Sequence, residues 1–391
     1  MKMKFVYLSA AVLALGSCSN EVLEDGFADK SNAISFSSYT PKSRAVSGDV
    51  TSDNMKGDNF GVAGYTTSDN KIYLYKGTAS GVEQKWDASA SAGAGSWEYA
   101  NMADLKFWPN SAMNFYAYFP YSDNTTFASS DASGDVMTIP STTCQHDVLF
   151  ARAANQSKTG RVPLTFHHAF SKIKGVQIEM PSNGTVYKSK CQLQVKEVTF
   201  INTATNGDIK VNTSGIASYS APTKPLVQST TDEAINRDNA TATPYDLINN
   251  GSNASGYLFA TNGTEQNKVI GTNKTLWNGA NLVSGTLSGS DLVCLKLTCK
   301  VWNGAEEKKY YYVGNDTSYG DIYIPLTGTH ASFDPNDANT TAFLAGKRYT
   351  YKIVMKDNVG FNENGDPILN PILFSVAGVD FWDDVTVTIT L

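Results

Sequence analysis

Hydrophobic and polar residues alternate with a period of two through much of the chain. The clearest segments are 113–119, 293–302 and 349–355, where apolar residues recur at every second position. This pattern predicts half-buried antiparallel strands, and clusters of Gly, Asn and Asp between the segments predict turns. Long helical periodicity is missing, and a short polar stretch around Thr231–Asn239 is expected to be a loop with one or two turns. The pattern therefore predicts an all-β fold.

The spacing of these segments predicts how the strands are organised. In Leu193–Phe200 the alternation slips by one position at Glu197, which indicates a β-bulge. Strands that follow one another at regular intervals favour sandwiches over βαβ units. A polar stretch before residue 161 predicts two sandwich domains, 45–160 and 161–391. The Asn- and Thr-rich stretch Pro222–Gly256 is expected to be a long insertion outside the compact core.

The N-terminus has the pattern of an export signal. Two lysines in the first four residues precede the apolar run Phe5–Leu15, which is too short to span a membrane. The sequence Leu15-Gly-Ser-Cys18 resembles the bacterial lipobox, in which the cysteine becomes lipidated. Residues 1–17 are therefore expected to be a lipoprotein signal peptide, and 18–44 a tether anchored through Cys18. An ordinary signal peptide with a chance cysteine is the alternative.

Arg44 is the only arginine among the first 150 residues. It follows a strand-like stretch, Ile34–Tyr39, and lies in a polar segment ahead of the first expected domain. Exposed basic residues in such linkers are where trypsin-like proteases cut. Cleavage between Arg44 and Ala45 would remove the strand-like stretch and everything before it. The alternative is a solvated linker arginine that is never cut.

The last segment of the sequence alternates in the same way. Its apolar face includes Val385, Val387, Ile389 and Leu391, and threonines form the other face. An apolar strand at a chain end must be docked, because an exposed edge invites aggregation. Two interpretations stay open. The strand is donated to a groove on another subunit, where these four side chains fill pockets, or it completes a sheet of its own chain.

Composition and charge exclude several classes of function. The chain has 391 residues and a net charge of −6, and no basic run, which argues against a nucleic-acid partner. Beyond Cys18, four cysteines remain at positions 144, 191, 294 and 299. They form no CxxC pair and have no histidine at ligand spacing, so no zinc site is expected. Cys294 and Cys299 lie five apart in one strand-like run, which places them on opposite faces and prevents a bridge.

Motifs of catalysis are missing from the sequence. It contains no nucleophile elbow, P-loop, dinucleotide fingerprint or HExxH helix, so no enzyme activity, catalytic residue, cofactor or metal is expected. His167 and His168 are adjacent on a strand and point to opposite faces, which favours a partly buried, hydrogen-bonded histidine over a metal pair. Six tryptophans could stack against sugars if they were exposed, whereas core packing is the simpler interpretation: Trp86, Trp97, Trp108, Trp277, Trp302 and Trp382.

Five segments in a fixed order resemble a known family. They are Lys106–Pro109, Met113–Pro120, Asp147–Ala151, Leu164–Ile173 and Leu344–Ile353. As a set they resemble the fimbrillin family of Bacteroidetes, the lipoprotein subunits of type V pili. The resemblance implies two tandem transthyretin-like β-sandwich domains and a cut after an arginine near the N-terminus, which carries over to Arg44. It also implies that the cut frees a first strand, and that a strand of a neighbouring subunit fills the vacated groove.

These observations together predict a structural or adhesive subunit of a cell-surface fimbrium. Its expected partners are other fimbrial subunits, the outer membrane through the lipid on Cys18 before processing, and a ligand on a host or bacterial surface. An acidic cluster at Glu21, Glu24 and Asp25 resembles the tag that sends such lipoproteins to the outer face of the outer membrane, although a solvated linker would look the same. The alternative function is a non-polymerising surface lipoprotein of the outer membrane that binds glycan.

Overall fold

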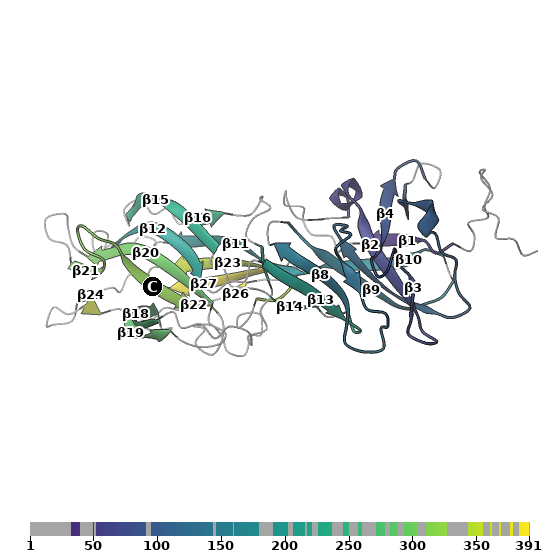
Figure 1. Ribbon diagram of the computed structural model, residues 1–391. Helices are drawn as coiled ribbons and strands as arrows, with labels where there is room; N and C mark the ends of the chain where they lie inside the picture. Colours follow the sequence, from purple (N-terminus) through teal and green to yellow (C-terminus); the bar gives the residue numbers. More distant parts are fainter. Residues whose placement is uncertain are drawn as a thin grey trace, which may run out of the picture.

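The all-β fold predicted from the sequence is confirmed in the computed structural model (Figure 1). Within the described residues, helix is limited to two 3₁₀ turns, η2 (Asn54–Gly57) and η4 (Met102–Asp104). The structure describes residues 33–39, 50, 52–90, 95–143, 146–158, 160–179, 191–201, 206–215, 217–220, 226–236, 245–249, 257–259, 271–277, 282–287, 293–303, 310–326, 343–354, 360–361, 367–368, 376–377 and 383–390. The two-domain and transthyretin-like details stay predictions.

The largest sheet has eight strands and contains the first strand of the chain. Its strands are β1 (Phe36–Tyr39), β2 (Phe60–Thr66), β3 (Ile72–Leu74), β4 (Val82–Asp87), β5 (Ser96–Tyr99), β6 (Met113–Phe119), β9 (Leu149–Gln156) and β10 (Val162–His168). Their order is β1-β10-β9-β6-β2-β4-β5, and β3 pairs with β2. β1 and β5 are therefore the two edges of this sheet.

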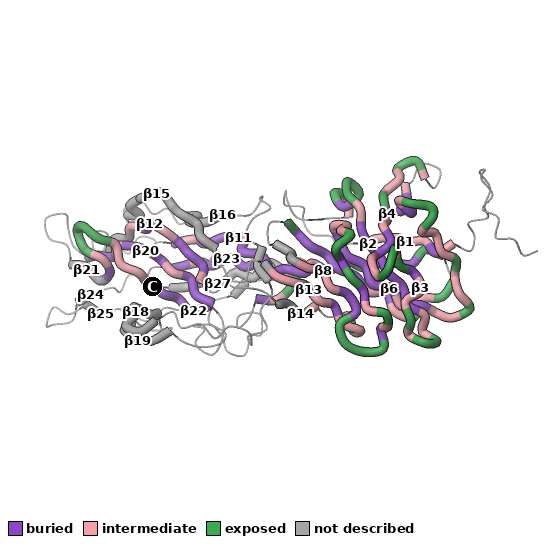
Figure 2. Tube along the Cα trace, in the orientation of Figure 1, coloured by how far each residue is buried: buried purple, intermediate pink, exposed green. Residues whose placement is uncertain are grey.

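A four-stranded sheet faces the eight-stranded one. It consists of β14 (Ala217–Ser220), β13 (Asn206–Asn212), β8 (Asp135–Thr143) and β7 (Thr126–Phe127) in that order. A buried cluster joins Tyr65 and Tyr116 of the larger sheet to Met137 and Val211 of the smaller one. A second cluster, rich in Phe, lies on the opposite face of the larger sheet and includes Phe36 and Phe115. Buried residues therefore continue along both faces of its central strands (Figure 2).

The rest of the chain builds two further large sheets. The six-stranded sheet contains β11 (Phe170–Glu179), β16 (Tyr245–Asn249), β17 (Tyr257–Phe259), β23 (Lys347–Val354), β26 (Val376–Ala377) and β27 (Asp383–Thr390). The seven-stranded sheet contains β12 (Cys191–Ile201), β15 (Leu226–Asn236), β18 (Gly271–Trp277), β19 (Leu282–Leu287), β20 (Cys294–Asn303), β21 (Tyr310–Val313) and β22 (Gly320–Pro325). Rings from the two sheets meet, with Phe200 of β12 5.9 Å from Tyr351 of β23. A small hairpin pairs β24 (Gly360–Phe361) with β25 (Pro367–Ile368).

Several predictions about individual segments are wrong. Pro222–Gly256 is not simply an insertion, because it contains β15, which pairs with β12, and β16, which pairs with β11. Thr231–Asn239 accordingly begins inside a strand. Segment 113–119 is buried on both faces rather than one, because Tyr116 and Tyr118 are also fully buried. Their hydroxyls donate to backbone oxygens of Thr213 and Ser122, at 3.2 and 2.7 Å, which makes burial of the polar ends tolerable.

Strand pairing also crosses the expected boundary at residues 160 and 161. β10 lies in the sheet of β9, and the β13–β14 hairpin returns to pair with β8. Segment 349–355 falls in β23, which pairs parallel, not antiparallel, with β11 and β27. The predicted bulge is confirmed, because the register of β12 shifts between Val195 and Glu197 against both of its neighbours.

Candidate functional site

The first strand presents two fully buried apolar side chains to the core. Ile34 and Phe36 are 0% exposed, and the serines between and after them are half-buried. Alternation along an extended chain carries residues 34, 36 and 38 to one face. The Phe36 ring meets Phe115 edge-on at a centroid distance of 5.4 Å, and Phe60 at 6.3 Å. This segment therefore fills a groove that Phe60 and Phe115 line.

One wall of the groove is β10, which runs parallel to β1. Phe36 lies opposite Val162, and the pairing continues to Tyr39 opposite Thr165. The N–H of Val162 donates to the Ser35 oxygen at 2.7 Å, so alternate residues of β10 face β1. Pro163 then faces β9 but has no N–H to donate. Consistently, the pairing of β10 with β9 covers only Phe166–His168. Among the described strands, the first half of β10 is paired with β1 alone.

The opposite wall is β5, at the far edge of the same sheet. The indole Nε1–H of Trp97 donates to the Ser38 hydroxyl oxygen at 2.7 Å. Trp97 is only 2% exposed and Ser38 is half-buried, so the donor of this hydrogen bond lies inside the protein. Arg161 and Glu98 also connect the two walls, with guanidinium and carboxylate atoms 3.6 Å apart. The sheet thus curls until its edge strands β1 and β5 approach each other, and β1 lies between β10 and β5.

Backbone contacts close the entrance of the groove. The N–H of Ile34 donates to the Lys106 oxygen at 2.9 Å, and Ala33 forms an antiparallel bridge with Phe107. Phe107 is 46% exposed, whereas the groove floor is buried. We define the β1 groove as the space lined by β10, β5 and Lys106–Phe107. It accommodates residues Ala33 to Tyr39.

A buried carboxylate holds the chain again a few residues after Arg44. The N–H of Val50 donates to Oδ2 of Asp147 at 3.0 Å. The same oxygen lies 2.8 Å from Nδ1 of His168. Asp147 is 4% exposed, so it is a fixed acceptor inside the protein. The chain is therefore attached on both sides of Arg44, by the β1 groove before it and by Asp147 after it.

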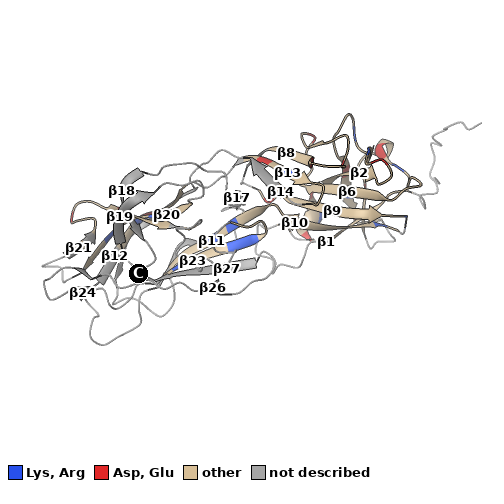
Figure 3. Cartoon of the chain, turned by 90° about the horizontal axis from the view of Figure 1, so that it is seen from below, with Lys and Arg blue, Asp and Glu red and all other residues tan. Residues whose placement is uncertain are grey.

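Four of the predicted site residues lie outside the described residues: Cys18, Arg44, Ala45 and Leu391. The other three belong to β27. This strand pairs parallel with β23 of its own chain, with Val385 opposite Tyr349, Val387 opposite Tyr351 and Ile389 opposite Ile353. The register also places Asp383 opposite Lys347 and Asp384 opposite Arg348. Basic residues of β11 and β23 lie side by side in this sheet, since Lys172 is in register with Arg348 (Figure 3).

The remaining candidates from the sequence have structural roles. Trp97 and Trp302 are buried, and Trp86 and Trp108 pack half-buried against the core. Trp277 and Trp382 lack a described side chain. Cys294 and Cys299 are buried and unbridged, and burial raises the pKa of both thiols, which keeps them protonated. Within the described part of the chain, no group of three or more His, Cys, Asp or Glu could hold a metal ion.

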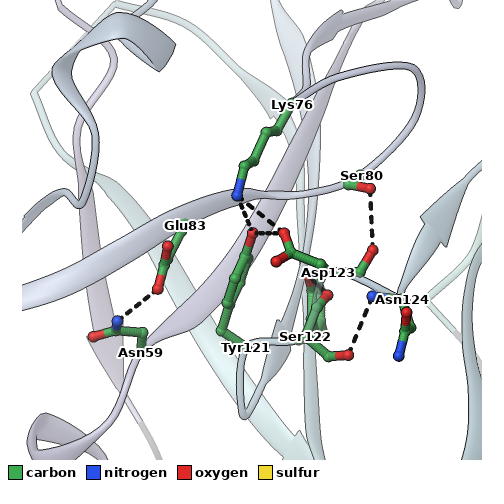
Figure 4. A network of polar contacts seen from close by, with 9 residues as sticks. Asn59, Lys76, Ser80, Glu83, Tyr121, Ser122, Asp123 and Asn124 are labelled. Atoms are coloured by element: carbon green, nitrogen blue, oxygen red, sulfur yellow. Dashed lines mark hydrogen bonds and ion pairs between the residues drawn. The ribbon is translucent and has the colours of Figure 1, made fainter.

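A polar network lies on exposed loops away from the groove (Figure 4). The Lys76 ammonium donates to the Tyr121 hydroxyl at 2.8 Å and to the Asp123 carboxylate at 3.0 Å. Tyr121 in turn donates to Asp123 at 2.5 Å. The hydrogen bond from Tyr121, and to a smaller extent the one from Lys76, hold the pKa of Asp123 below its ordinary value. The network connects the loop after β3 to the loop after β6 at the surface of the protein.

The roles of Trp97, Asp147 and β10 at the β1 groove are not predictable from the sequence. The alternation of Val162, Leu164 and Phe166 is typical of a strand but does not show which strand pairs with it. Trp97 and Ser38 are 59 positions apart, and no local pattern relates them. Among the described residues, no helix has the length and apolar character that crossing a bilayer requires.

The described part of the chain is nearly all β, and its first described strand is an edge strand that pairs with one neighbour over four residues. The family model for fimbrillin-like proteins matches residues 43–366, so the chain belongs to the fimbrillin-like family. The match begins after β1 and ends before β27. This family is one of structural fimbrial subunits, which places the chain in the class of fimbrial proteins at the cell surface.

Solved structures of fimbrial proteins are similar in outline. A fimbrial protein from Bacteroides vulgatus has a TM-score of 0.47 and 14% identity, over 90% of this chain and 99% of its own. A fimbrilin from Porphyromonas gingivalis has a TM-score of 0.33 and 11% identity, over 92% of this chain and 96% of its own. No curated protein matches the sequence at a significant level.

Proposed function

We propose that the chain is a subunit of a surface fimbrium that assembles by protease-triggered strand exchange. A cut between Arg44 and Ala45 separates β1 from the rest of the protein, and a strand of a neighbouring subunit takes its place. The observation that carries this proposal is the attachment of β1. It is an edge strand, it pairs with one neighbour over four residues, and it precedes Arg44 in the chain.

The energetics of the groove suit an exchange. Burial of two large apolar side chains contributes about 3–6 kcal/mol before ordering costs. An incoming strand with similar side chains recovers this burial and the backbone hydrogen bonds, so exchange costs little at equilibrium. The cut favours the incoming strand, because β1 is then no longer covalently attached and is diluted once it dissociates. Val50 stays bound to Asp147, so the new N-terminus does not detach with it.

The anchor and the location belong to the same proposal. The chain is exported as a lipoprotein, lipidated on Cys18, and held at the outer face of the outer membrane until the cut releases it. Labelling of cells with a palmitate analogue tests this directly. The label is expected on the uncut protein, and it should disappear with Cys18→Ala and after cleavage at Arg44.

For the last strand we propose donation to another subunit. Val385, Val387, Ile389 and Leu391 would fill the pockets of that subunit's groove. In the free chain β27 pairs with β23 over eight residues, so donation exchanges one ladder for another. Deletion of Asp384–Leu391 should abolish filaments on cells. A control with Thr386→Ser and Thr388→Ser, on the opposite face by alternation, should still assemble. Normal filaments after the deletion would refute donation.

The experiment that tests the cut uses purified full-length chain and an arginine-specific protease. We expect a new N-terminus at Ala45 and, when fimbrial subunits from the same bacterium are added, SDS-resistant ladders on gels. Arg44→Ala should prevent both, whereas the matched control Lys42→Ala should behave as the parent chain. Ladders that form equally well from the uncut Arg44→Ala chain would contradict the proposal.

A further inference from the structure

We propose that the β1 groove selects its occupant by a short side-chain pattern, and that the occupant comes from a different kind of subunit. The pattern is a large aliphatic residue, then an aromatic residue two positions later, then Ser or Thr two positions after that. β1 carries it as Ile34, Phe36 and Ser38, and β27 of the same chain does not. The inference rests on the proposed function, since it specifies what replaces β1.

The aromatic position is shaped by the rings around it. Phe36 is fully buried and contacts Phe60 and Phe115 edge-on. Phe60 also packs against Trp97 at 4.8 Å and Phe166 at 5.5 Å, so the floor is a continuous set of rings. A close-packed site of this kind does not collapse around a smaller side chain, and Val in place of Phe leaves a cavity.

The hydroxyl position is set by Trp97. Its Nε1–H is a donor only, it is buried, and it donates to Ser38 at 2.7 Å. A strand with an apolar residue at this position would leave the indole N–H buried without an acceptor, which weakens binding by about 5- to 150-fold. A hydroxyl is the smallest side-chain group that satisfies the indole. An ionised carboxylate at the same place would lose its hydration.

The last strand of this chain fails both requirements. Along Asp383–Thr390 one face offers Val385, Val387 and Ile389, which include neither an aromatic ring nor a hydroxyl. The other face carries Asp384 and threonines, which supply hydroxyls but have no aromatic residue two positions before them. Just before it, Phe381 is followed two positions later by Asp383, a carboxylate rather than a hydroxyl. A second copy of this chain is therefore a poor donor, and the fitting partner is a strand with the aromatic–x–hydroxyl pattern from another chain.

The test uses the full-length chain with a site for a sequence-specific protease placed between residues 40 and 49. After the cut, labelled peptides in excess compete for the groove, and fluorescence anisotropy reports binding. The peptides are the native 31–41 sequence, its Ser38→Thr, Ser38→Val and Phe36→Val forms, and a peptide of residues 379–391. The uncut chain is the control and should bind none of them.

We expect the native and Ser38→Thr peptides to bind with similar affinity. The Ser38→Val peptide should bind about 5- to 150-fold more weakly, and the Phe36→Val and 379–391 peptides about tenfold or more weakly. In a Trp97→Phe chain the difference between the native and Ser38→Val peptides should vanish. It should persist in the matched control Trp86→Phe, whose ring packs on Trp97 but takes no part in the hydrogen bond to Ser38.

The outcomes separate the inference from the proposed function. Equal binding of the native and Ser38→Val peptides, or of the native and 379–391 peptides, overturns the selection rule and leaves strand replacement standing. Failure of every peptide to bind the cut chain overturns strand replacement itself, and the selection rule with it. The peptide series decides both points even if the Trp97→Phe chain does not fold.

Discussion

The first and last described strands of this protein have the same topology and opposite degrees of attachment. β1 and β27 each lie parallel to a neighbour, β10 and β23 respectively. β1 is a sheet edge and pairs over four residues. β27 pairs over eight residues with β23, and on its other side β26 pairs with Thr386 and Val387.

This difference bears on which end of the chain opens more easily. Opening a short edge strand costs little more than the burial of its few side chains, whereas an internal strand of twice the length opens only with much of its sheet. The N-terminal strand is therefore the one expected to open without disturbing the rest of the fold. The proposed donation of β27 would require a larger rearrangement, which binding to a neighbouring groove would have to offset.

The largest expected effect is in hydrogen exchange of the uncut chain. Backbone amides of β27 should exchange about 100-fold or more slowly than those of β1, because β1 opens locally and β27 opens with its sheet. Mass spectrometry of peptic fragments measures the ratio. Equal protection of the two strands would show that β1 is an integral part of its sheet, and the contrast between the two ends would be lost.

Removal of the aromatic side chain of β1 gives the next largest effect. Phe36→Ala should lower the free energy of unfolding of the uncut chain by about 3–5 kcal/mol, because the rings around it cannot close the cavity. Urea unfolding of the full chain measures it. Ser37→Ala, on the other face of the same strand, should stay within about 0.5 kcal/mol. Once the strand has been cut away and removed, the two variants should be indistinguishable from the parent.

The attachment after Arg44 should contribute less. Asp147→Ala removes the acceptor of the Val50 N–H and the partner of His168, and should cost about 1–3 kcal/mol. It should also speed proteolysis around residue 50, which gel analysis after limited digestion would show. Asp147→Asn keeps an oxygen that accepts from the Val50 N–H, so its stability and its rate of proteolysis should lie between those of the parent chain and Asp147→Ala. No change in proteolysis would show that Asp147 does not hold this segment.

The smallest effect is expected at the exposed network, far from either end. Since the pKa of Asp123 is depressed in the folded chain, its carboxylate stabilises the fold above pH ~4, and this contribution is lost as the pH falls through the lowered value. Its exposure limits the contribution to below about 1 kcal/mol. Asp123→Asn should thus shift the urea midpoint slightly at pH 7 and by less at pH 3. A larger midpoint shift at pH 3 than at pH 7 would show that the pKa of Asp123 is not lowered in the folded chain.

Local pattern was sufficient to predict the strands and the class of fold. The strand at Ile34–Tyr39 and the bulge at Glu197 both follow from alternation, which the backbone geometry imposes residue by residue. The alternation of Val82, Gln84 and Trp86 also marks β4, although Ser, Ala and Gly residues follow it in the chain. Strand existence is thus encoded locally even where composition is polar.

Pairing depends on contacts between distant residues and was not predictable. Nothing near residue 206 shows that β13 returns to pair with β8, across the boundary predicted at residue 160. The threonines and charges of β15 suggested a loop, because an edge strand with one neighbour tolerates polar residues on both faces. The β1 groove is of the same kind, because its two walls meet only when the sheet has curled.

Pro163 makes the first half of β10 depend on β1 for its strand pairing. Because it cannot donate toward β9, the first half of β10 has one strand partner in the described chain, and loss of β1 leaves that half with none. Under the proposed cleavage, a cut subunit that meets no neighbour would therefore be exposed to misfolding and digestion. The time of cutting would then matter as much as its position, and a cut made when the next subunit is already present would avoid this loss.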